Sequence, residues 1–180
     1  MSIYIALLRG INVGGRNLLG MSDLRDMFEA LALADARSLL QSGNFVFRSD
    51  RRTSPVLERL LEVETKKRFG IAVDYFVRTP NEWQAIVARN PFPEEAKRDP
   101  SHLVLMCLKS APQAADLKSL QAAIKGPEIV RADGKQLYIV YPAGIGTSKL
   151  TNALIERILD TRGTGRNWNT VIKLASLSQE

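Results

Sequence analysis

The sequence predicts an α+β protein made of two ferredoxin-like subdomains of βαββα type, with mixed, mainly antiparallel sheets packed into one compact chain. Two runs, IYIALL at 3–8 and LVLMCL at 103–108, are apolar at every position, which is typical of central strands covered on both faces. Each run is followed by a helical pattern, two short β-prone segments and a second helix. We therefore expect an N-terminal subdomain at 1–78 and a C-terminal one, with an extra terminal helix, at 79–180.

The first predicted helix follows the first strand after a glycine-rich loop. Ser22 is a candidate N-cap, and apolar residues recur at i, i+3, i+4 and i+7 from Leu24 to Leu31. SLLQ at 38–41 and NFVF at 44–47 are short and β-prone, with serine and glycine between them. This pattern predicts a tight hairpin.

The second predicted helix has both a start and a stop signal. Ser54 before Pro55 suits the N-cap and first helical position, and Gly70 suits the end. Residues 73–78 then alternate between apolar and other side chains and predict the strand that closes the first βαββαβ unit.

The second half repeats this order. Thr79 and Glu82 are spaced as a capping box at the start of a helix. NPFPEEAKRDP at 90–100 is the most turn-rich stretch and predicts a linker or a flap. A helix near 112–124 is expected after the apolar run.

Glycine-containing segments predict a hairpin and two helices in the rest of the chain. EIV and LYIVY flank Asp133 and Gly134, which predicts a hairpin. GIGTSK at 144–149 is expected to open a helix that Gly163 closes as the C′ residue, and TGRNWNTVIKL at 164–174 to start a final helix.

Five segments carry a family resemblance: RGINVGGRN at 9–17, QSGNFVF at 41–47, NPFP at 90–93, YPAGIGTSKLTN at 141–152 and GTGRNWNTVIKL at 163–174. They resemble the bacterial domain of unknown function 1697 family, and the likeness runs nearly end to end. The resemblance implies two ferredoxin-like subdomains, in agreement with the element order. It implies no activity, because the family is uncharacterised.

Composition narrows the function classes. Hydrophobic residues make up 45% and charged residues 24%, which are ordinary values for a globular protein and exclude a fibrous or disordered class. Cys107 and His102 are the single residues of their types, so we expect no disulfide within the chain, no zinc site, and no cofactor. The longest early apolar run is too short for a membrane span, and we expect a cytoplasmic protein without membrane partners.

Known phosphate and hydrolase motifs are incomplete. Gly10 and Gly15 have P-loop spacing, but Arg16 and Asn17 stand where lysine and serine or threonine are needed. No GxGxxG or GxSxG motif occurs, so a dinucleotide-binding fold and a serine hydrolase both lack support. Catalytic residues therefore remain unassigned, and whether the protein is an enzyme is left open.

A ligand site is predicted where polar, glycine-containing loops converge on a cleft between the subdomains. GIGTSK and GTGRN each lead into a helix N-terminus, which favours an anion. We expect a small phosphate- or carboxylate-bearing ligand, with a nucleotide among the candidates. The predicted ligand-binding residues are Arg9, Asn12, Gly14, Gly15, Asn17, Gln41, Ser42, Asn44, Ser148, Lys149, Asn152, Arg166, Asn167, Asn169 and Lys173.

Three alternatives stay open. In the simplest one, Thr147 and Asn167 only cap helices and the glycines only make turns. A nucleic-acid binder with RRM-like sheets would use Tyr4 to stack a base, although NFVF fails the fuller RNP1 pattern. A transferase or hydrolase acting on the cleft ligand would need one of the unassigned carboxylates. The +6 net charge suits an anionic ligand or nucleic acid, and the oligomeric state is not predicted.

Overall fold

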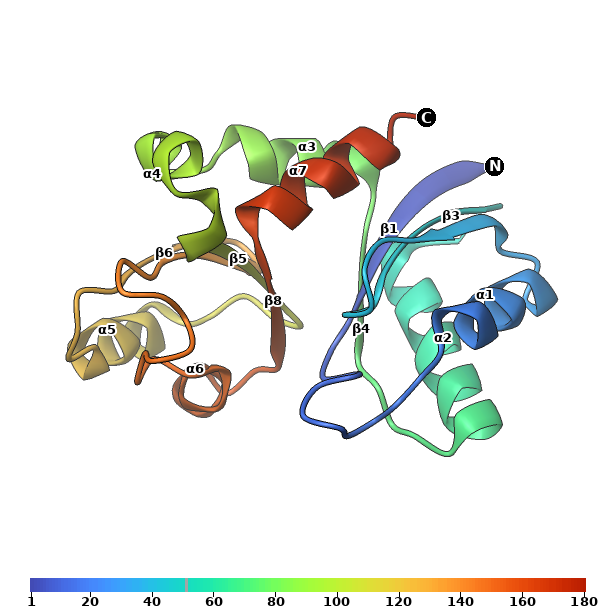
Figure 1. Ribbon diagram of the computed structural model, residues 1–180, viewed down its shortest axis with the longest axis horizontal. Coiled ribbons are helices and arrows are strands. Elements are labelled where there is room, and N and C mark those ends of the chain that lie inside the picture. Colours follow the sequence, from blue (N-terminus) through green and yellow to red (C-terminus); the bar gives the residue numbers. More distant parts are fainter. Residues whose placement is uncertain (51) are drawn as a thin grey trace. The chain divides into compact units, whose positions relative to one another are not determined.

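The structure is a computed structural model that describes residues 1–50 and 52–180. It contains two compact units, Met1–Ile86 with Lys173–Glu180, and Val87–Ile172, each built on a four-stranded sheet (Figure 1). Strand pairing is antiparallel throughout the described residues, where a mainly antiparallel mixture was predicted. The predicted α+β, ferredoxin-like fold is thereby confirmed.

The first unit has the predicted βαββαβ order, with its strands arranged β2-β3-β1-β4. The central strand β1 pairs with both β3 and β4. Its elements are β1 (Ser2–Leu8), α1 (Met21–Ala30), β2 (Ala34–Ser38), β3 (Asn44–Ser49), α2 (Ser54–Phe69) and β4 (Tyr75–Arg78).

The second unit repeats this topology, because its strands are arranged β6-β7-β5-β8 with β5 between β7 and β8. Helices α3 (Pro80–Ala88) and α7 (Trp168–Leu177) each contribute residues to both units. The other elements are α4 (Pro93–Arg98), the 3₁₀ helix η1 (Pro100–His102), β5 (Leu103–Leu108), α5 (Ala114–Ala123), β6 (Ile129–Asp133), β7 (Gln136–Val140), α6 (Asn152–Leu159) and β8 (Gly163–Asn167).

The core of the first unit lies between its sheet and helices α1 and α2. Phe28 on α1 stacks on Phe45 and meets Phe47 edge-on. Tyr4 belongs to the same core and is 6% exposed. Neither Tyr4 nor Phe45 is therefore available to stack a base as an RRM aromatic does.

Both central strands are buried on both faces, as their apolar runs predicted. In the second unit, Met106 and Leu108 pack with α5 and α6, while the alternating Leu105 and Cys107 are equally buried. Cys107 is thus a core residue, as expected from its apolar run.

The sequence correctly predicted the start of α3 and the end of α2. The Thr79 backbone N–H donates to Glu82 Oε2 at 2.7 Å, and the Glu82 N–H donates back to Thr79 Oγ1 at 3.2 Å, which completes the capping box of α3. Gly70 ends α2 with φ +71°.

Four local predictions from the sequence are wrong. Helix α1 begins at Met21 after Gly20, so Ser22 is not its cap, and α2 is preceded by Thr53 rather than capped by Ser54. Residues 90–100 form α4 and part of η1 instead of a linker or flap. The hairpin in the first unit uses β2 at Ala34–Ser38, which shares only Ser38 with the predicted SLLQ segment.

The end of α6 was also predicted wrongly. Asp160 occupies the left-handed C-cap position with φ +49°, and Gly163 begins strand β8. A Cβ on Gly163 would lie 2.6 Å from the Met106 side chain and 3.0 Å from the Cys107 carbonyl. Strand β8 lies so close to β5 that a residue with a Cβ would clash here, which explains why position 163 is a glycine.

Buried tyrosines should make the protein less stable in alkaline solution. Burial raises the pKa of Tyr138 and of Tyr141 to about 12 and also raises that of Tyr75, since a phenolate loses its hydration. The unfolded phenols ionise near the ordinary value of 10.0, so the folded state holds more protons above that pH. We expect the urea midpoint to be steady below about pH 10 and to fall as pH rises toward about 12.

A variant checks this assignment. Tyr141→Phe removes one titrating group, together with the hydrogen bond to the Leu150 carbonyl, and should make the alkaline decline shallower. If the urea midpoint of Tyr141→Phe changed with pH in the same way as that of the unmodified protein, the Tyr141 phenol would titrate alike in both states.

Candidate functional site

The loop after β1 is a small hairpin. The Arg16 N–H donates to the Val13 carbonyl at 3.0 Å, and the two residues form a β-bridge. Gly14 and Gly15 both have positive φ, +57° and +73°, as a two-residue type I′ turn requires. These two predicted site residues therefore serve a turn, and the turn carries Arg16 on an exposed tip.

Two asparagines fix this hairpin to the body of the first unit. Asn12 Nδ2 donates to the carbonyls of Leu19 and Gln41 at 3.0 and 2.8 Å, and its Oδ1 accepts from the Leu19 N–H. Asn17 Nδ2 donates to the Gly10 carbonyl at 3.1 Å. Both asparagines have φ near +50°, which this residue type tolerates.

The QSGN segment lies beside the hairpin. Asn44 is fully buried and donates to the Leu39 carbonyl and to Ser42 Oγ, at 2.7 and 3.1 Å. The Gly43 carbonyl accepts from the Leu8 N–H at 2.9 Å. Together with the Asn12–Gln41 bond, these contacts bring two of the predicted polar loops together within the first unit.

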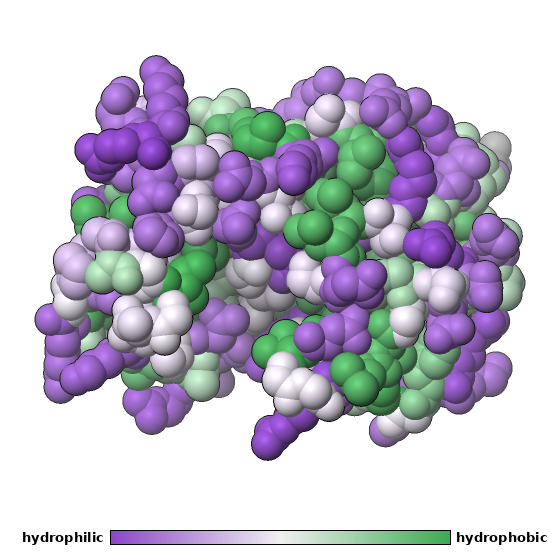
Figure 2. Space-filling view, viewed as in Figure 1, coloured by the Kyte–Doolittle hydropathy of each residue, from purple (hydrophilic) through white to green (hydrophobic). Residues whose placement is uncertain are grey.

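Arg9 at the base of the hairpin forms an ion pair with Asp74, with Nη1 3.7 Å from Oδ2. Val13 and Leu18 in the same loop are 64% and 68% exposed. Figure 2 shows green, hydrophobic atoms among purple ones at the lower edge of the first unit, where Figure 1 draws this loop.

The GTGRN residues of the second unit serve the strand and the following helix. Arg166 is buried in β8 and donates to Thr164 Oγ1 at 2.7 Å and to the Gly165 carbonyl at 2.8 Å. Burial lowers the pKa of Arg166 to about 10, because the guanidinium loses hydration. Asn167 Oδ1 accepts from the Thr170 N–H at 3.1 Å and so caps α7.

The GIGTSK loop is held by side-chain contacts of its own. The cap of α6 is Thr151, whose Oγ1 accepts from the Leu154 N–H, whereas the Thr147 hydroxyl donates to the Ala143 carbonyl. Ser148 Oγ donates to Glu128 Oε1 at 2.6 Å. This bond ties the loop to the segment that leads into β6.

The remaining predicted site residues are exposed. Asn152 is the first residue of α6, Asn169 lies in the first turn of α7, and Lys173 lies in the part of α7 that belongs to the first unit. The expected convergence of all three loops on one cleft stays a prediction.

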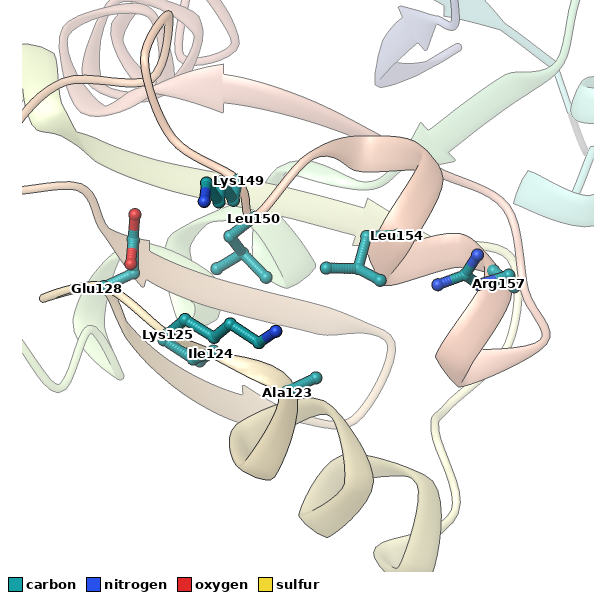
Figure 3. A pocket seen from close by; sticks show the side chains of 9 residues that line it. Ala123, Ile124, Lys125, Glu128, Lys149, Leu150, Leu154 and Arg157 are labelled. Atoms are coloured by element: carbon teal, nitrogen blue, oxygen red, sulfur yellow. The ribbon is translucent and has the colours of Figure 1, made fainter.

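A cavity of about 320 Å³ lies in the second unit, beside the C-terminal end of α5, the segment after it and helix α6 (Figure 3). Ile124, Leu150 and Leu154 give it an apolar lining. These side chains also pack against the core of the second unit, so the lining is fixed by the fold. Volumes of this order suit a small organic ligand.

Charged side chains surround this apolar lining. Lys125, Lys149 and Arg157 supply three positive charges, and Glu128 supplies one negative charge. Within residues 1–50 and 52–180, none of the three cations forms an ion pair. We name these three residues the cationic cluster. Such a site can attract a phosphate or carboxylate.

Of the three cations that line this cavity, sequence reasoning identified Lys149 but missed Lys125 and Arg157. It also identified Ser148, which binds the lining residue Glu128. The helical spacing could have indicated Arg157, because it lies three residues after Leu154 and therefore on the same face of the predicted helix. Lys125 carried no comparable signal.

The described residues contain no group of three or more histidine, cysteine or acidic side chains placed to hold a metal ion. Among them there is also no helix with the length and apolar character needed to cross a membrane.

Comparison with known proteins gives the fold and a family. The family model described as "Protein of unknown function (DUF1697)" matches residues 1–138, so the match ends before the GIGTSK and GTGRN segments. The solved structure of the conserved bacterial protein SP0830 from Streptococcus pneumoniae is similar, with a TM-score of 0.75, 20% sequence identity and 98% coverage of each chain. No curated protein matches this chain.

Proposed function

The chain belongs to the DUF1697 family of proteins of unknown function, and we propose that it is a cytoplasmic protein that binds a small phosphate- or carboxylate-bearing molecule in the cavity beside α5 and α6. One observation carries the proposal. The cationic cluster surrounds an apolar lining, and no described carboxylate neutralises it through an ion pair.

The charge balance of the cavity supports an anion. Its three cations outnumber its single carboxylate, and that carboxylate already accepts a hydrogen bond from Ser148. A phosphate offers several acceptor oxygens to lysine and arginine side chains. The apolar residues between the charges favour a ligand with an organic body over a bare inorganic ion.

A charge-removal experiment tests the proposal. The variant carries Lys125→Gln, Lys149→Gln and Arg157→Gln, all of them exposed side chains whose loss should leave the fold intact. Its thermal unfolding is compared with that of the unmodified protein in the presence of nucleotides, sugar phosphates, carboxylates, and short RNA and DNA. A ligand at about 100 times its Kd adds roughly 2.7 kcal/mol, a shift of several degrees. The variant should lose this shift.

A matched control keeps the net charge equal. Lys97→Gln, Lys118→Gln and Lys135→Gln remove three exposed lysines of the same unit that do not line the cavity. This control should retain the shift of the unmodified protein. Equal shifts of the unfolding temperature in both triple variants would exclude the cationic cluster as the binding site. A shift seen only with RNA or DNA, and lost steeply as the salt concentration rises, would indicate a nucleic-acid ligand instead.

A further inference from the structure

The single carboxylate of the cavity lies at one end. Figure 3 shows Glu128, with Lys149 near it, and Arg157 on opposite sides, with Leu150 and Leu154 between them and the Lys125 side chain extending along the cavity. An anionic group therefore suits the Arg157 end, whereas a hydrogen-bond donor suits the Glu128 end. A ligand that fills the cavity needs both groups on one apolar body.

The Glu128 carboxylate is held in place. Ser148 Oγ donates to Oε1 at 2.6 Å, and a Cβ on residue 126 would lie 2.4 Å from Oε2, so Gly126 leaves room for this oxygen. A carboxylate has about four acceptor positions, of which Ser148 uses one. Glu128 thus combines a fixed position with unused acceptor capacity.

The middle of the cavity suits a weakly polar group. The aliphatic side chains of Ile124, Leu150 and Leu154 line it, and the volume of about 320 Å³ is near the lower limit for ligand pockets. A purine ring with N–H groups on one edge fits this combination of aliphatic walls and a carboxylate at one end.

We infer that the ligand is a purine nucleoside monophosphate of the guanine type, whose base donates N–H groups to Glu128 and whose phosphate lies toward Arg157 and Lys125. The inference rests on the proposed function, because it uses the same cavity and the same cationic cluster. Guanine presents two adjacent N–H donors, and paired donors on one carboxylate give strong, directional recognition.

Isothermal titration calorimetry with three probes tests it: guanosine monophosphate, inosine monophosphate, which lacks the exocyclic amine, and ribose 5-phosphate, which lacks the base. We expect guanosine monophosphate to bind about tenfold more tightly than inosine monophosphate, as one hydrogen bond to a charged group allows, and ribose 5-phosphate to bind most weakly. Glu128→Gln keeps an oxygen acceptor for Ser148. This variant should bind guanosine monophosphate and inosine monophosphate with about equal affinity.

The control is Glu94→Gln, which removes an exposed carboxylate on α4 outside the cavity and should leave the preference unchanged. Equal affinities for the three probes, or a preference that survives Glu128→Gln, would overturn the nucleotide inference while leaving anion binding intact. If no phosphate or carboxylate binds to the unmodified protein, both the inference and the proposed function are wrong.

Discussion

Replacing Phe28 by alanine should lower the free energy of unfolding of the first unit by about 3–5 kcal/mol. The side chain is 0% exposed and contacts two aromatic rings, with centroids 4.8 Å from Phe45 and 5.1 Å from Phe47. Truncation removes this packing and leaves a cavity between α1 and β3, which the fixed sheet can close only in part. Urea denaturation followed by far-ultraviolet circular dichroism measures the loss.

The control for Phe28→Ala is Leu18→Ala, in the exposed loop after β1. Leu18 is 68% exposed, so its truncation should change stability by less than about 0.5 kcal/mol. A Phe28→Ala protein as stable as the Leu18→Ala protein would contradict the position of Phe28 at the centre of this core.

Gly43→Ala should destabilise the first unit by roughly 2–5 kcal/mol, the sum of backbone strain and overpacking. Gly43 has φ +82°, and a Cβ there would lie 2.8 Å from Leu8 Cβ and 2.8 Å from Ile11 Cδ1. Leu8 belongs to the central strand, so its Cβ has little freedom to move. The change in urea midpoint, with an unchanged slope, gives the value.

Gly10→Ala separates the two causes. Gly10 has φ +69°, but a Cβ there would meet nothing within 4 Å, so this variant carries the strain without the clash. We expect it to lose about 1–2 kcal/mol. If Gly10→Ala were as destabilising as Gly43→Ala, the close packing of the QSGN segment against β1 would not be the cause.

The fold was predictable because both halves carry strong local signals. The apolar runs at 3–8 and 103–108 specified central strands, and the Thr79–Glu82 box specified a helix start through contacts three residues apart. The predicted secondary structure was wrong where contacts between distant parts of the chain determine the conformation. Gly163 was assigned to a helix end because glycine is common there, but it pairs with Leu108 of β5 and so lies in a strand.

The candidate site was less predictable, for a related reason. Asn12, Asn44 and Asn167 were identified as polar groups for a ligand, yet each has side-chain hydrogen bonds to nearby parts of the protein. Lys125 and Arg157 are far apart in the sequence and belong to no motif. Only the packing of the segment after α5 near α6 brings them to one cavity.

The most direct test of anion binding in the cavity beside α5 and α6 is to record the backbone amide chemical shifts of the protein by nuclear magnetic resonance, with and without a saturating anion. The anion is one that stabilises the protein in the thermal-unfolding experiment. We expect the largest chemical-shift changes at 123–128 and 148–157, and their loss when the cationic cluster is replaced by glutamine. Changes centred on the loop at 9–19, with the cavity unaffected, would contradict the proposed site.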